Sequence, residues 1–87
     1  MKFVNIGFNN MILDTRIVAV ISPESAPAKR MVGEAKDNAR IIDCTGGRRT
    51  KSVIVTDTDH IVLCALSCEA LYTRLNDNKN DDNGERL

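Results

Sequence analysis

The sequence KSVIVTDTDHIVLCAL, residues 51–66, carries the clearest structural signal in the chain. Two apolar, β-branched runs, residues 51–56 and 60–66, flank a short polar segment from Asp57 to Asp59. Runs of this composition favour β-strands, and a connection this short leaves room only for a hairpin. The stretch therefore predicts two antiparallel strands.

Three further segments before this hairpin also predict strands. Residues 2–8 alternate apolar and polar side chains, residues 16–21 are apolar on both faces, and residues 40–45 form a short apolar run. Residues 7–10, GFNN, predict a turn.

Two segments predict helices instead. A helix is expected from about residue 24 or 25 to about residue 38, because prolines suit a first helical turn and Ser22 or Ser25 can cap it. Residues 67–75 predict a second, short helix with Ser67 as its N-cap, docked through its leucines and Tyr72.

This order of elements predicts one α+β domain with a small mixed or antiparallel sheet, one main helix and a short C-terminal helix. The domain is expected to span residues 1–75, and residues 76–87 are an acidic tail in which we expect disorder. Several strands are apolar on both faces, but only one substantial helix is available to cover them. We therefore expect the chain to form a homo-oligomer, because uncovered apolar sheet surface needs a partner.

Length and composition limit the classes of function. A chain of 87 residues is one domain with a small core. No signal peptide is recognisable, and no apolar run approaches the ~18 residues that span a bilayer. We expect a cytoplasmic protein with no membrane partner and with reduced, buried thiols. These belong to three cysteines that cannot all pair: Cys44, Cys64 and Cys68.

The net charge is zero, but it is distributed unevenly. Residues 75–87 hold four acidic and two basic side chains, a net charge of −2, which leaves +2 for residues 1–74. So small a surplus predicts no strongly basic surface. Anion binding must then come from local clusters repeated across subunits.

Few residues are candidates for catalysis or metal binding. His60 and Cys64 share one face of a strand about 13–14 Å apart, which is too far for a base and its nucleophile. Asp57 and Asp59 are typical of a turn, and a metal-dependent enzyme built on these four side chains is the least favoured hypothesis. We expect no enzyme, cofactor, metal or small-molecule substrate.

The best candidate for a binding site is CTGGRRTK, residues 44–51. Its glycines free the backbone so that Arg48 and Arg49 can both project outward, and Lys51 closes the run. A guanidinium group matches phosphate, so the cluster predicts a nucleic-acid partner, with a solvated polar loop as the alternative. Arg16 is expected beside this loop because it starts a strand. Scarce aromatic residues favour duplex over single strands.

The chain contains three blocks that resemble the bacterial extracellular matrix regulatory protein RemA family: VNIGFNN, RIVAVISPESAPAKR and IDCTGGRRTKSVIVTDTDH. The resemblance covers about residues 2–75. It implies a nucleoid-associated transcriptional activator of biofilm-matrix genes that binds duplex DNA without a helix-turn-helix. It also implies a fold related to LytTR DNA-binding domains and a ring-shaped homo-oligomer, an octamer, around which DNA can wrap. The family's DNA-contacting arginines carry over onto Arg16, Arg48 and Arg49.

Two hypotheses of function lead. The first is a non-enzymatic, oligomeric DNA-binding regulator that binds DNA through Arg16, Arg48, Arg49 and Lys51. The alternative is an RNA-binding or scaffold protein that uses the same basic loop.

Overall fold

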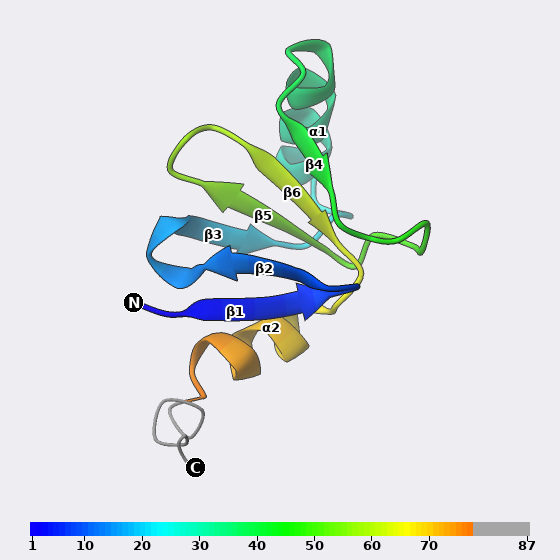
Figure 1. Ribbon diagram of the computed structural model, residues 1–87. Coiled ribbons are helices and arrows are strands. Elements are labelled where there is room, and N and C mark those ends of the chain that lie inside the picture. The colour runs from blue at the N-terminus through cyan, green and yellow to red at the C-terminus, as the bar shows by residue number, and fades with distance from the viewer. Residues whose placement is uncertain (78–87) are drawn as a thin grey trace.

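The hairpin of residues 51–66 forms the middle of a four-stranded sheet in the computed structural model, which describes residues 1–77 (Figure 1). β5 is antiparallel to both β3 and β6, whereas β4 runs parallel to β6. The predicted hairpin and the predicted mixed sheet are therefore confirmed. The strands, in their order across the sheet, are β3 (Ile17–Ile21), β5 (Ser52–Thr56), β6 (Ile61–Cys64) and β4 (Ile41–Asp43).

A separate two-stranded sheet begins the chain. It pairs β1 (Phe3–Gly7) with β2 (Asn10–Leu13) in antiparallel orientation. β2 is absent from the sequence-based prediction, because a segment of four residues that follows an asparagine-rich turn shows little periodicity. It forms because it pairs with β1, which places Ile12 opposite Val4.

Three helical segments complete the described fold: η1, a 3₁₀ helix (Asp14–Arg16), α1 (Ala26–Asp37) and α2 (Cys68–Leu75). The strand predicted over residues 16–21 begins at Ile17 instead, because Arg16 belongs to η1. Ser25 and Ser67 cap α1 and α2, each accepting a hydrogen bond from the backbone N–H three residues later, at 3.2 and 3.1 Å. Neither α1 nor α2 has the length and apolar character of a membrane span.

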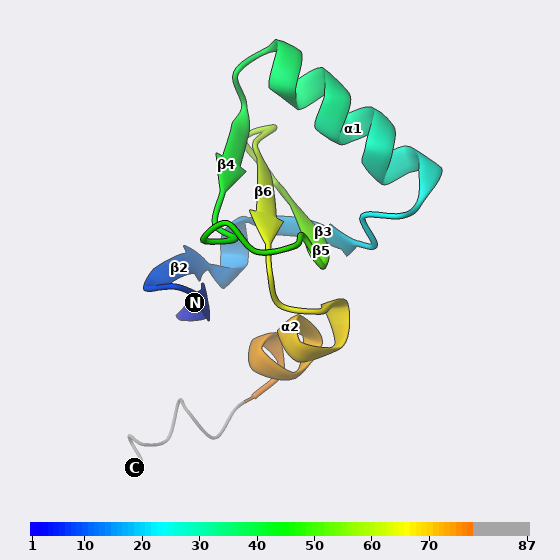
Figure 2. The same ribbon diagram turned by 90° about the vertical axis from the view of Figure 1, so that its right-hand side faces the viewer.

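The side chains of β5 point alternately to the two faces of the sheet and are buried on both. Val53 packs with Ala28 and Ala35 of α1, whereas Ile54 packs with Ile6 of β1 and Leu71 of α2. The result is three layers, with the sheet between α1 on one side and the β1–β2 hairpin with α2 on the other (Figure 2). β5, which is apolar on both faces, is thus covered by a separate layer on each face.

The chain covers its own sheet more fully than we expected from one substantial helix, because the hairpin and α2 cover the second face. Leu71 docks α2, but Tyr72, predicted to do the same, is 70% exposed. Large apolar side chains reach solvent on the outer surface instead: Met1, Phe3, Phe8, Met11, Val18, Ile42 and Tyr72.

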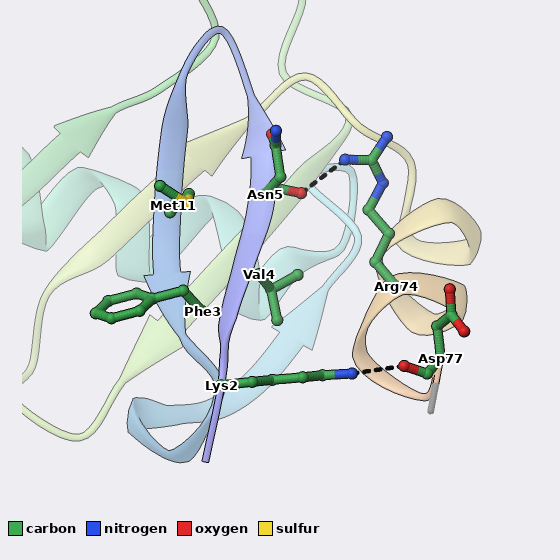
Figure 3. A pocket seen from close by; sticks show the side chains of 7 residues that line it. All are labelled: Lys2, Phe3, Val4, Asn5, Met11, Arg74 and Asp77. Atoms are coloured by element: carbon green, nitrogen blue, oxygen red, sulfur yellow. Dashed lines mark hydrogen bonds between the residues drawn. The ribbon is translucent and has the colours of Figure 1, made fainter. Parts of the chain in front are cut away.

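α2 also protects the free edge of β1 (Figure 3). Arg74 Nη1 donates a hydrogen bond to the Asn5 carbonyl oxygen at 2.8 Å, and Lys2 Nζ donates to the Asp77 carbonyl oxygen at 2.7 Å. The side chains around these contacts line a pocket of about 360 Å³. An edge occupied in this way is less open to pairing with a foreign strand.

Ile54→Ala is expected to lower the free energy of unfolding by about 2–5 kcal/mol, because it leaves a cavity beneath the hairpin and α2. Ile42→Ala is the matched control. Ile42 lies on the edge strand β4 and is 45% exposed, so the loss there should be about 1 kcal/mol or less. Urea denaturation measures both, and equal losses would contradict the central position of β5 in the core.

Candidate nucleic-acid interface

The loop of residues 45–50 is fixed at both ends. Asp43 Oδ1 accepts hydrogen bonds from the backbone N–H and the hydroxyl of Thr45, at 2.9 and 2.6 Å. These bonds hold the pKa of the Asp43 carboxyl below its ordinary value, with the hydroxyl as the larger cause. Arg48 N donates to the Thr45 carbonyl oxygen at 3.0 Å, and Lys51 N donates to the Cys64 carbonyl oxygen at 2.8 Å. The loop is therefore an ordered turn.

The two glycines of the loop adopt left-handed backbone conformations, with φ of +62° at Gly46 and +83° at Gly47. At Gly46 the requirement is also steric. A Cβ atom there would lie 2.9 Å from the ring of Phe8, which belongs to the turn between β1 and β2. Gly46 thus permits the close approach of two segments that are distant in the sequence.

The predicted site arginines all carry exposed side chains with identifiable partners. Arg48 places its Cζ 5.7 Å from the centre of the Phe8 ring, within the range of a cation–π contact. Arg49 Nη2 lies 3.3 Å from Glu24 Oε2, in an ion pair whose side chains are 80% and 77% exposed. A pair as exposed as this contributes little stability, so a phosphate can displace the carboxylate at low cost.

Arg16 does not lie beside the loop, contrary to our expectation. β3 and β5 are antiparallel, with Ile17 opposite Thr56, so Arg16 lies at the end of β5 that is remote from residues 45–50. There its Nε contacts Asp57 Oδ1 at 3.3 Å. Figure 1 shows the connection that holds Arg16 and the β4–β5 connection at opposite ends of the sheet. Within one chain, Arg16 therefore lies apart from Arg48 and Arg49, so the three arginines occupy two separate regions of the surface.

Phe8 is a residue of the candidate interface that sequence reasoning missed. Its ring lies against Gly46, and the Arg48 guanidinium lies over the same ring. A signal for it exists in the sequence: a phenylalanine at a turn position where glycine, asparagine or aspartate is normally preferred.

Of the remaining candidates, Lys51 lies at the end of the loop and His60 does not. The Lys51 side chain is exposed at the end of the loop, whereas His60 Nδ1 shares a hydrogen bond of 2.8 Å with the Thr58 hydroxyl in the β5–β6 turn. Cys44 and Cys64 are buried, as expected, whereas Cys68 is only half-buried, and burial raises the pKa of the Cys44 thiol. Within residues 1–77 no three histidine, cysteine, aspartate or glutamate side chains gather as metal ligands.

Comparison with known proteins gives a match to the family described as RemA-like, extracellular matrix regulatory protein A-like, over residues 3–75. The chain belongs to the RemA-like family. This confirms the resemblance found in the sequence.

RemA-like relatives of similar length carry the curated name "Putative regulatory protein". One from Thermoanaerobacter sp. (strain X514) is 55% identical over 90% of this chain and 81% of its own length. Another from Carboxydothermus hydrogenoformans is 48% identical over 93% of each chain. A third from Acaryochloris marina is 46% identical over 98% of this chain and 97% of its own. These names support a regulatory protein in general.

Gly46→Ala is expected to lower the free energy of unfolding by about 1–3 kcal/mol, because alanine is strained at this φ and its methyl group displaces the Phe8 ring. Gly33→Ala is the opposite control: it lies in α1 with open space around it, so it should raise stability by about 0.5–1 kcal/mol. Denaturation curves test both, and a stabilising Gly46→Ala would show that the loop and turn are not in contact.

Thr45→Val is expected to raise the pKa of the Asp43 carboxyl towards its ordinary value, because it removes the hydroxyl donor and keeps the backbone N–H. Because the folded pKa is lowered, this interaction stabilises the loop above pH 3.8 and is lost as pH falls below that through the lowered value. An NMR titration of the Asp43 carboxyl carbon measures the shift. An unchanged pKa would contradict the hydroxyl as its main cause.

Proposed function

We propose that this RemA-like protein is a transcriptional regulator that binds duplex DNA through Arg48 and Arg49. The observation that carries the proposal is the fixed loop of residues 45–50, which presents two adjacent, exposed arginines at one edge of the molecule. Following the family resemblance, we extend the proposal to a cytoplasmic, nucleoid-associated activator of biofilm-matrix genes.

The electrostatic state of the two arginines supports phosphate as the ligand. Within residues 1–77, Arg49 is paired only with exposed Glu24, and Arg48 forms no ion pair with a carboxylate. Guanidinium groups at such positions can bind phosphate oxygens in a bidentate manner without desolvating a core charge. Lys51 adds a further positive charge at the end of the loop.

One subunit offers too few positive charges for tight binding, since residues 1–74 carry a net charge of only +2. We therefore include in the proposal a ring-shaped homo-oligomer, such as an octamer, that repeats the loop along a wrapped duplex. A long DNA path can contact Arg16 of one subunit and the loop of another, even though these two positions lie at opposite ends of the sheet within a single chain. The exposed apolar side chains supply surface for contacts between subunits, among them Phe3, Met11, Val18 and Tyr72.

The double variant Arg48→Ala, Arg49→Ala is expected to lose DNA binding at ~150 mM salt while keeping its oligomeric state, because both side chains are exposed and the bonds that fix the loop are unaffected. Fluorescence anisotropy with a promoter-length duplex across a salt series measures the affinity. The slope of log K against log salt should become shallower by about 0.9 for each phosphate that the variant no longer neutralises.

Glu24→Gln is the matched control, because it removes the carboxylate that competes for Arg49 and should leave DNA affinity equal or tighter. A double variant that still binds DNA at ~150 mM salt would refute the assignment. Competition against a structured RNA of equal length tests the alternative: preference for the RNA would favour an RNA-binding protein.

A further inference from the structure

Phe8 occupies a backbone conformation that suits it poorly. Phe8 and Asn9 form the two-residue turn between β1 and β2, with φ of +55° and +65°. Turns with two positive φ values favour asparagine, aspartate and glycine, and a bulky residue there is a conformational outlier. Asn9 fits this preference, but Phe8 does not.

Burial in the core does not explain the aromatic side chain. Phe8 is 50% exposed and belongs to neither of the two buried apolar clusters. Its ring instead lies against Gly46 and close to the guanidinium of Arg48. The ring therefore contacts the arginine loop and leaves part of its surface open to solvent.

Arg48 differs from the other two candidate arginines in its partner. Arg16 and Arg49 each contact a carboxylate at 3.3 Å, which occupies N–H donors and offsets their charge. The Phe8 ring attracts the Arg48 guanidinium through its π-face but, unlike a carboxylate, does not neutralise its positive charge. Arg48 is thus oriented while its N–H donors stay available to another acceptor.

We propose that Phe8 is a positioning residue of the DNA interface: its ring holds the Arg48 guanidinium in the orientation that binds a backbone phosphate. The inference rests on the proposed function and identifies the β1–β2 turn as a second segment of that site. The Arg48 side chain then loses less conformational entropy when it binds DNA.

Phe8→Asn tests this without weakening the turn, because asparagine favours the left-handed conformation. Its unfolding curve should show stability equal to or above that of the wild type. DNA affinity should fall by about 2- to 5-fold for each subunit engaged, with a shallower salt slope. Phe8→Tyr, which keeps the ring, should bind DNA like the wild type.

A double-mutant cycle separates positioning from direct contact. In an Arg48→Ala background, Phe8→Asn should cause no further loss of affinity. An equal loss in both backgrounds would overturn the inference, because Phe8 would then act on DNA without Arg48. Unchanged affinity and salt slope in Phe8→Asn alone would also overturn it, and so would unfolding of that variant, which would reveal a structural role.

The two proposals fail in distinguishable ways. If the wild type binds no duplex at low salt, the proposed function fails and this inference fails with it. If the wild type binds and Phe8→Asn binds identically, only the role of Phe8 is refuted. NMR gives a measurement without DNA: the Arg48 Hδ protons should show a ring-current shift that Phe8→Asn abolishes, and its absence in the wild type would contradict the contact.

Discussion

Burial of β5 on both faces determines how the other elements are arranged around it. Val53 and Ile54 are fully buried on opposite sides of one strand, so each face needs its own covering layer. α1 covers one face, and the β1–β2 hairpin with α2 covers the other (Figure 2). This arrangement brings the turn of the hairpin against the loop that leads into β5. The candidate interface is therefore a consequence of how the core is covered.

The candidate interface combines an ordered loop backbone with arginine side chains that are only weakly paired. Asp43 and Thr45 fix the loop, and Gly46 lets the Phe8 ring approach it closely. The arginine side chains nevertheless stay at the surface, where the exposed Arg49–Glu24 ion pair is weak and the Phe8–Arg48 contact leaves the N–H donors of Arg48 available. Membership of the RemA-like family supports a regulatory protein in general.

Much of the local structure could be predicted from the sequence because it depends on short-range chemistry. The hairpin of residues 51–66 and the cap at Ser67 follow from β-branched runs and from a serine that precedes a helix, and Ser25 is one of the two serines predicted to cap α1. β2 could not be predicted in this way, since it is stabilised by its pairing with β1. The sequence also predicts Tyr72 as a docking residue of α2 beside its leucines, but Tyr72 is exposed, whereas Leu71 is buried.

For the candidate site, the positive loop and its glycines could be predicted from the sequence, because charge and backbone freedom belong to individual residues. The sequence did not determine which residues meet there. Only the tertiary structure separates Arg16 from Arg48, because antiparallel pairing of β3 and β5 places them at opposite ends. Only the tertiary structure brings Phe8 to Arg48, because packing on the second face of the sheet joins segments that no local pattern connects.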